Sequence, residues 1–335
     1  MRHRNRKIKV KESWNEIYKN NIEIKPTQSF GYYSSLFKTY YLHPRRLTKR
    51  RISINLFNGA IKNDRMILPL VVDRKKQTLQ GIANYKRLDY EDVISSANDL
   101  QFIKNGIGSI LSQYRGYKIS FSNINEDSLL YSVLNKLLIP EEPCVKILLP
   151  KSYNCYYTSL SKHQRQNIRT AYNKINSENL VLRTFSKRDT RIPKTIWNEC
   201  ERIYEQRHNL GGTKFQVWEN RQRNAYHHIF QKVDESVINI LYYKGKIIAY
   251  MAGLYRDCQK CYYIPRLCIN NDYANLSPGI ILLNEVIKEM INKKQEILDL
   301  MLGDEPYKLA MGGVVTMNYK LDSTVDKVLE ECIRP

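Results

Sequence analysis

Cysteine is absent from the first 143 residues of this 335-residue chain, and the seven cysteines that follow are an odd number spread over residues 144–332. This distribution does not fit the paired framework of a small disulfide-stapled protein, so we expect reduced thiols. Cys258 and Cys261 have the spacing of a zinc or redox motif, and Cys268 follows seven residues later. Because no fourth ligand lies nearby and the pair falls at a predicted hairpin tip, we predict no metal site.

Long apolar runs are also missing. No stretch approaches the roughly 20 apolar residues that a membrane-spanning helix needs. The basic residues at the start of the chain are not followed by the apolar segment of a signal peptide. We therefore expect a cytoplasmic protein, either free or attached peripherally to the inner face of the membrane.

Acidic residues are scarce relative to basic ones, 33 against 54, which gives a net charge of +21. This balance favours polyanionic partners such as nucleic acid, phosphorylated cofactors or an anionic membrane surface. Two basic segments stand out, residues 2–11 and residues 45–51. The alternative interpretation of each is a solvated surface without a partner.

Two sets of helix and strand patterns fill the chain, as expected for a length that exceeds the usual single core. Residues 29–137 show the order α-β-β-α-β-α, beginning with aromatic residues at helical spacing in residues 30–41. The pattern restarts after Pro140 and Pro143, and residues 144–301 include three consecutive strands, a periodic helix and a further strand. We predict an α+β fold with a basic N-terminal tail (1–25), a first domain (26–143) and a second domain (144–335).

Pro265 lies inside the third of those three strands, where proline removes a ladder hydrogen bond, so the strand should be bulged there. The loop that follows, residues 274–279, leads into the helix that begins near Ile280. Free amides and the positive helix end would converge at this loop, which suits a phosphate group. An ordinary helix-capping turn is the alternative.

The segment at residues 298–308 combines a short apolar strand, a glycine turn and several ionisable side chains. Two carboxylates, a phenol and an ammonium follow the strand within six residues, and such groups can accept and return protons. The alternative interpretation is a solvated loop. The ionisable residues are Asp299, Asp304, Glu305, Tyr307 and Lys308.

Three segments together resemble the FemAB-related branch of the GNAT superfamily, which includes the CelD- and BioF2-like acetyltransferases. They are residues 149–175, residues 238–283 and the sequence LDLMLGDEPYKLAMG at residues 298–312. The last is the most specific. The resemblance implies tandem GNAT-like units, each a mixed, mostly antiparallel sheet flanked by helices, of which the second is catalytic and the first degenerate.

The resemblance also implies roles for individual residues. Glu305 or Asp304 would act as the catalytic base and Tyr307 as the proton donor, with Lys308 binding an anionic group. The donor site and the remaining substrate contacts form larger sets. The donor set is Ser277, Pro278, Gly279, Ile280 and Leu267, and the substrate set is Asp299, Lys308, Tyr263, Arg165 and Arg169, with Arg207 as a further candidate.

The implied reaction transfers an acyl group from acyl-CoA or another acyl thioester to an amine, without a metal, in cell-envelope or polysaccharide biosynthesis. Residues 277–279 read Ser-Pro-Gly and lack the family's fuller Arg/Gln-x-x-Gly-x-Gly/Ala turn. An aminoacyl-tRNA donor, as in Fem-like relatives acting on an envelope precursor, is therefore the alternative. A third hypothesis, from another class, is a non-catalytic protein that binds nucleic acid or a membrane surface on a GNAT scaffold. The oligomeric state is left open.

Overall fold

The computed structural model describes residues 2–41, 51–59, 63–82, 90–208 and 224–333. The chain forms two compact units: the first consists of Met1–Pro143 and Thr316–Pro335, and the second of Cys144–Val315. The expected C-terminal domain included residues 316–335, which instead cluster with the first unit. They do so because strand β12 (Gly313–Thr324) pairs with a strand of that unit and helix α11 (Val325–Ile333) packs on its helices.

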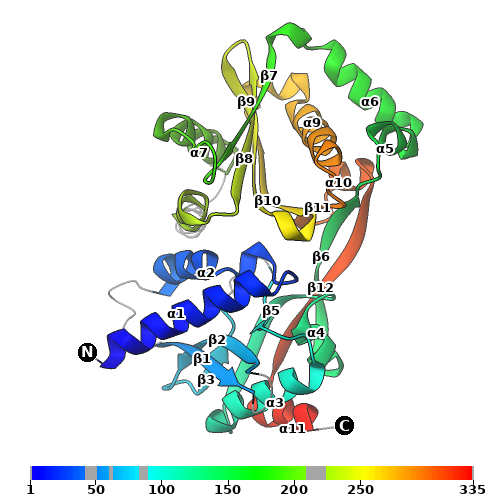
Figure 1. The fold of residues 1–335 in the computed structure, drawn as a ribbon. Helices are drawn as coiled ribbons and strands as arrows, with labels where there is room; N and C mark the ends of the chain where they lie inside the picture. The colour runs from blue at the N-terminus through cyan, green and yellow to red at the C-terminus, as the bar shows by residue number, and fades with distance from the viewer. Residues whose placement is uncertain (1, 42–50, 60–62, 83–89, 209–223, 334–335) are drawn as a thin grey trace. The chain divides into compact units, whose positions relative to one another are not determined.

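The sheet of the first unit has the strand order β1-β2-β3-β5-β12, with β4 paired to β2 (Figure 1). β3 and β5 run parallel, and the other described pairings in this unit are antiparallel. The strands not yet given are β1 (Arg51–Asn58), β2 (Arg65–Asp73), β3 (Thr78–Gln80), β4 (Ile94–Ser95) and β5 (Lys118–Asn125).

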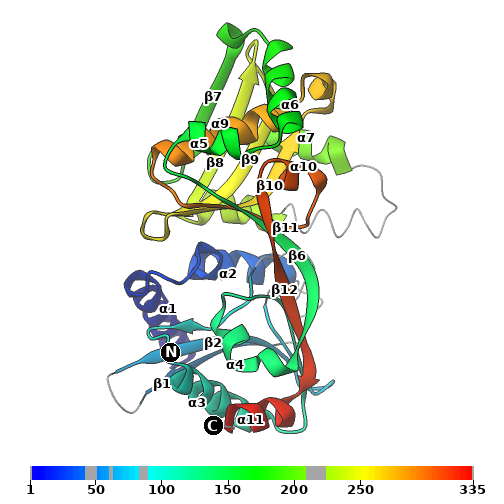
Figure 2. The same cartoon turned by 90° about the vertical axis from the view of Figure 1, so that its right-hand side faces the viewer.

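Helices cover this sheet and supply its core. Helix α1 (Arg2–Asn20) forms where a basic tail was expected, and it buries Trp14, whose ring lies 5.2 Å from that of Tyr33 on α2 (Phe30–Leu36). α3 (Leu100–Leu111), α4 (Leu129–Leu134) and α11 share one apolar cluster with the inner residues of the strands (Figure 2). Of the second basic segment predicted from the sequence, residues 45–50 lie outside the described residues.

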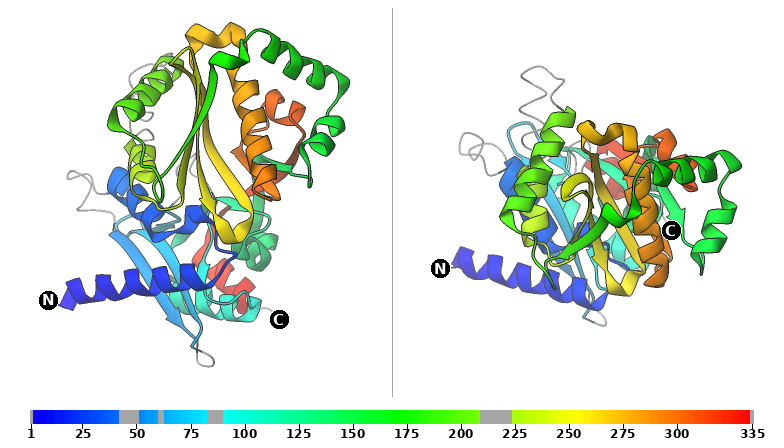
Figure 3. Two further views of the ribbon diagram at one scale, coloured as in Figure 1. Left: turned by 45° about the horizontal axis from the view of Figure 1, so that its top comes forward. Right: turned by 90° about the horizontal axis from the view of Figure 1, so that it is seen from above.

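The sheet of the second unit has the order β6-β11-β10-β9-β8-β7. α5, α6 and α9 cover one face, and α7 with the helical residues 224–232 covers the other (Figure 3). The strands are β6 (Leu138–Leu148), β7 (Leu180–Ser186), β8 (Ser236–Tyr243), β9 (Lys246–Arg256), β10 (Cys261–Ile269) and β11 (Ile297–Leu302). The helices are α5 (Tyr153–Ser159), α6 (Lys162–Asn173), α7 (Lys194–His208) and α9 (Pro278–Asn292).

The predicted α+β class, with mixed and mostly antiparallel sheets flanked by helices, is confirmed. The three consecutive strands are β8, β9 and β10, and the bulge predicted at Pro265 is present as a register shift between Tyr263 and Arg266. Both units contain a parallel strand pair joined by a crossover helix, β3-α3-β5 and β10-α9-β11. This repeat supports the expectation of tandem units.

Candidate active site

Strands β10 and β11 separate partway along their length. They pair in parallel only from Cys261↔Ile297 to Tyr263↔Asp299, although β10 continues to Ile269. After this point Ile264 and Pro265 stand outside the register with β9. The proline thus interrupts the ladder with β9 at the place where the parallel pairing with β11 ends. We call the region beyond Tyr263 and Asp299 the strand opening.

Asp299 and Tyr263, both expected to contact substrate, are partners at the last paired position before the strand opening. Both are almost fully buried, at 1% and 5% exposure. Asp299 Oδ1 accepts a hydrogen bond of 2.9 Å from the Met301 N–H, and Met301 has a φ of 56°. The carboxylate therefore stabilises the irregular backbone with which β11 turns away.

Helix α9 begins beside β10 with an N-terminus that no side chain caps. Ser277 has a φ of 55° and makes no side-chain cap bond, and Pro278, the first helical residue, has no N–H. The Ile280 N–H bonds to the Ser277 carbonyl at 3.1 Å. A Cβ at Gly279 would lie 3.1 Å from Ile269 Cγ2 and 3.7 Å from Leu267 Cδ2. The structure thus brings the predicted donor residues together against β10, with a positive helix end among them.

The turn after β11 is held by Lys308, on α10 (Pro306–Ala310). Its ammonium is buried and donates to the carbonyl oxygens of Leu302 and Gly303 at 2.5 and 2.9 Å, and it pairs with Glu305 at 2.9 Å. These three contacts match the three donors of an ammonium group. Gly303 has a φ of 90°, which favours glycine. Asp304 is exposed beside it.

Tyr307 remains protonated at neutral pH. The residue as a whole is 38% exposed. Desolvation of its phenol raises the pKa to about 12, the negative charge of Glu305 adds to the rise, and Arg207 opposes it. The Arg207 guanidinium also donates to the Leu267 carbonyl at 3.1 Å. Tyr307 therefore lies close to α7 and to the part of β10 beyond the bulge, in a state that can donate a proton.

A buried arginine fixes β10 just after the bulge. The Arg266 guanidinium lies 3.1 Å from Glu201 and over the rings of Tyr204 and Tyr226, at 3.9 and 4.5 Å from their centroids. Its side chain is 3% exposed. Sequence reasoning did not single out this cluster, and the available signal was an arginine directly after Pro265 in an otherwise apolar strand.

Arg165 and Arg169, predicted to contact substrate, lie on α6 and have different surroundings. Arg165 donates to the carbonyl oxygens of Thr158 and Leu160 at the end of α5. Arg169 is exposed and bonds to Gln166 at 2.8 Å. α6 packs on α9, so these two residues do not belong to the cluster around Tyr307.

Within the described ranges, no group of three or more His, Cys, Asp or Glu side chains is arranged to hold a metal ion. Cys258 lies in a short turn between β9 and β10, and Cys261 begins β10. Among the helices of the described residues, none is both long and apolar enough to cross a bilayer.

Comparison with known proteins agrees with this architecture. Residues 162–309 match the model of the acetyltransferase (GNAT) domain. No curated protein matches the chain in sequence. The matched segment contains the strand opening, the start of α9 and the turn that holds Tyr307.

Solved structures share the fold across both units at low identity. The C-terminal domain (DUF2156) of a protein named as a lysylphosphatidylglycerol synthetase from Agrobacterium fabrum has a TM-score of 0.57 and 11% identity, covering 96% of this chain and 94% of that one. A Bacteroides thetaiotaomicron protein of unknown function has a TM-score of 0.56 and 12% identity, with coverages of 88% and 90%. FemX has a TM-score of 0.55 and 9% identity, with coverages of 93% and 98%.

These identities show a shared fold, and the family match adds the chemical class. The predicted resemblance to GNAT enzymes with a FemAB-like fold is therefore confirmed. The chain is an acyltransferase, and residues 162–309 of its second unit match the acetyltransferase (GNAT) domain.

Proposed function

We propose that the second unit transfers an acyl group from an acyl thioester, such as acyl-CoA, to an amine acceptor at the strand opening. The arrangement that carries the proposal is a backbone opening with an uncapped helix N-terminus on β10 and a protonated tyrosine near the same strand. The helix end suits the phosphates of the donor. The backbone of Ile264, which lies outside the strand register with β9, suits the developing oxyanion.

In the proposed step the amine nitrogen attacks the acyl carbonyl carbon. The C–N bond forms, the C–S bond breaks, and the amine proton passes to the carboxylate of Glu305, with Asp304 as the alternative base. Tyr307 gives its proton to the departing thiolate and recovers one through solvent. Asp299 and Tyr263 shape the closed end of the opening. Lys308, whose three donors are engaged, holds the turn and does not bind substrate in this scheme.

A second donor, aminoacyl-tRNA, is supported by particular observations. The turn at residues 277–279 is shorter than the usual coenzyme A turn, and the net charge is +21. One similar structure is named for making lysylphosphatidylglycerol, and another is FemX. With that donor the bond that breaks is an ester C–O bond, and Tyr307 protonates the leaving ribose oxygen, which becomes a hydroxyl. Envelope biosynthesis at the cytoplasmic face of the membrane is the proposed setting for either donor.

Transfer assays with labelled acetyl-CoA and with charged tRNA, each against a panel of amines, distinguish the two donors. Tyr307→Phe should lower kcat by about 100-fold with whichever donor is active, because a positioned proton donor contributes that much or more. Tyr117→Phe in the first unit is the matched control and should leave kcat unchanged. The wild-type rate should not decline below about pH 10, because the pKa of Tyr307 is about 12.

The catalytic proposal fails if the double variant Glu305→Gln/Tyr307→Phe keeps the wild-type rate. It also fails if the wild-type chain transfers from neither donor while binding nucleic acid or anionic vesicles. The latter result would instead support the non-catalytic hypothesis.

A further inference from the structure

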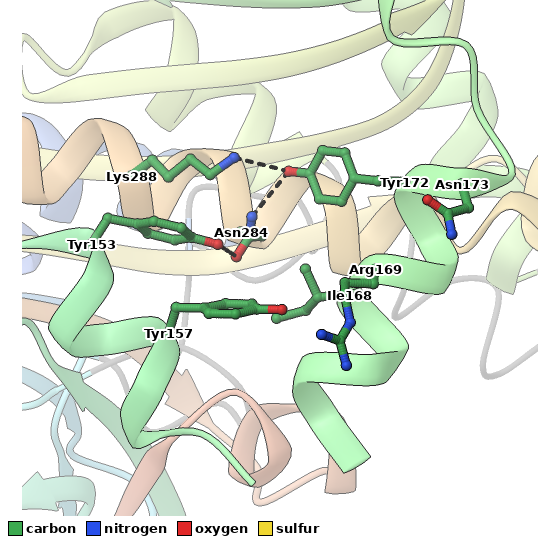
Figure 4. A pocket seen from close by; sticks show the side chains of 8 residues that line it. All are labelled: Tyr153, Tyr157, Ile168, Arg169, Tyr172, Asn173, Asn284 and Lys288. Carbon is green, nitrogen blue, oxygen red and sulfur yellow. Dashed lines mark hydrogen bonds between the residues drawn. The ribbon is translucent and has the colours of Figure 1, made fainter. Parts of the chain in front are cut away.

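A pocket lies between α5, α6 and α9, on the helical layer that covers one face of the second unit's sheet (Figure 4). Its volume is about 290 Å³. Small-molecule sites commonly measure about 300–1,000 Å³, so this volume suits a ligand with a single ring. The lining residues are Tyr153, Tyr157, Ile168, Arg169, Tyr172, Asn173, Asn284 and Lys288.

Aromatic faces form much of the wall. The rings of Tyr153 and Tyr157 are 6.0 Å apart and tilted by 31°. Figure 4 shows them one above the other, with Ile168 beside Tyr157. The Lys288 ammonium lies 5.1 Å from the Tyr153 ring and 5.0 Å from the Tyr172 ring. The pocket thus offers flat apolar surface within reach of cationic groups.

Hydrogen bonds fix these rings in place. Asn284 is fully buried, accepts from the Tyr153 hydroxyl at 2.9 Å and donates to the Tyr172 oxygen at 3.0 Å. Tyr172 donates to Glu285, which also pairs with Lys288 at 2.7 Å. The wall is therefore preorganised. The Asn284 amide is used within it, so the polar contacts open to a ligand come from the Asn173 amide and the phenol oxygens.

Charge distinguishes Arg169 from Lys288. Glu285 balances Lys288, whereas the described contact of Arg169 is the neutral amide of Gln166. Arg165, one turn earlier on the same helix, is engaged with carbonyl oxygens of α5. Arg169 therefore gives the pocket an unbalanced positive charge in a guanidinium fork, a geometry that matches carboxylate and phosphate.

We propose that this pocket binds one monosaccharide that carries an anionic group, either a sugar phosphate or a sugar acid. The C–H face of the sugar stacks on Tyr157, its hydroxyls bond to the phenol and amide groups, and its anion pairs with Arg169. A sugar ring has an apolar C–H face and a hydroxylated edge. The face matches the tyrosine rings of the pocket, and the edge matches its polar groups. Asn284 follows Gly279 by five residues, about 7.5 Å along α9. The site is thus distinct from the helix end, and its occupancy does not depend on the transfer reaction.

Titration calorimetry on the full chain tests this with four probes: glucose 1-phosphate, glucuronate, glucose and inorganic phosphate. At least one anionic sugar should bind 10-fold or more tightly than both glucose and phosphate, and the better of the two identifies the anion. Phosphate binding as tightly as the anionic sugars would overturn the proposal, as would binding of neither anionic sugar.

Variants connect the binding to the pocket. Arg169→Gln should weaken binding by about 10-fold or more, and Tyr157→Leu should weaken it similarly. Lys162→Gln removes one exposed charge from the same helix outside the pocket and should have no effect. Tyr157→Phe separates the ring from its hydroxyl and keeps the test valid if the leucine variant does not fold. Unchanged affinity in both Arg169→Gln and the Tyr157 variants would overturn the assignment.

Discussion

Helices α3 and α9 occupy equivalent places in the two units, since each connects two parallel strands, yet their N-termini differ. At α3, the Asp99 side chain accepts a hydrogen bond of 2.6 Å from the Phe102 N–H and caps the helix. At α9, Ser277 has a left-handed conformation and caps nothing. A carboxylate at one helix end repels an anionic ligand, and the uncapped end attracts one.

The ends of the parallel strand pairs that these helices join also differ between the two units. A Cβ at Gly81, just after β3, would lie 2.5 Å from the Glu91 carboxylate and 2.6 Å from the ring of Phe121. Glu91 accepts from the Ile82 N–H at 3.2 Å, and Asp92 accepts from three backbone N–H groups of Val93, Leu129 and Leu130. Burial raises the pKa of Asp92 to about 6.

The first unit therefore fills the end of its parallel pair with its own side chains, whereas the second leaves backbone groups outside the ladder at Ile264 and Pro265. The topology is shared, and the difference is that a break in the strand register, at Pro265, lies beside the parallel pair of the second unit. Function is expected at this break.

Removing the Arg266 guanidinium, which fixes β10, should have the largest effect on the difference between the two units. Arg266→Met removes the cation that lies 3.1 Å from the Glu201 carboxylate, whose side chain is 15% exposed, and we expect a loss of about 3–5 kcal/mol in the stability of the second unit. Hydrogen exchange of β10 amides, compared with β3 and β5 amides, measures the loss in the affected unit. The double variant Arg266→Met/Glu201→Leu should regain most of it. A loss of stability below about 1 kcal/mol in the single variant would show that Arg266 does not fix β10.

Giving α9 the cap that α3 has should abolish much of the donor affinity. Ser277→Asp places a carboxylate at the helix end, and aspartate tolerates the left-handed conformation of this residue. Charge repulsion of about 3 kcal/mol at short range would weaken coenzyme A binding by about 100-fold. Ser277→Asn, with the same shape and no charge, is the control and should bind within about threefold of the wild type. Equal affinities for the two variants would remove the α9 N-terminus from the donor site.

Much of the fold followed from the sequence because its signals were local. The spacing of large residues in α2 and α9, the hairpin of β1 and β2, and the bulge at Pro265 each depend on a few neighbouring residues. β7 was missed because it lacks an alternation of apolar and polar residues: it begins with three consecutive apolar residues, of which Val181 is exposed. The assignment of residues 316–335 failed because β12 pairs with β5, a contact almost 200 residues away in the sequence.

The sequence predicted which ionisable residues lie at the candidate site. It did not predict which of the charged side chains are engaged within the fold. The motif at residues 298–308 marked the turn, but only the folded turn shows that the Lys308 ammonium is taken up by Leu302, Gly303 and Glu305. Arg165 and Arg169 were equivalent in sequence spacing. Their difference depends on the end of α5, which a helical pattern does not reveal.

Removing the cap of α3 is the mildest way to break the comparison. Asp99→Ala deletes the acceptor for the Phe102 N–H and should lower the stability of the first unit by about 1 kcal/mol, the usual loss for an N-cap. Asp99→Asn keeps an acceptor there and should cost only a few tenths of that amount. Neither change should alter donor affinity or transfer rate, because the first unit fills its strand end independently of the cap. Denaturant unfolding, with the same transfer assay, measures both quantities, and a tenfold loss of transfer in Asp99→Ala would show that the first unit takes part in the reaction.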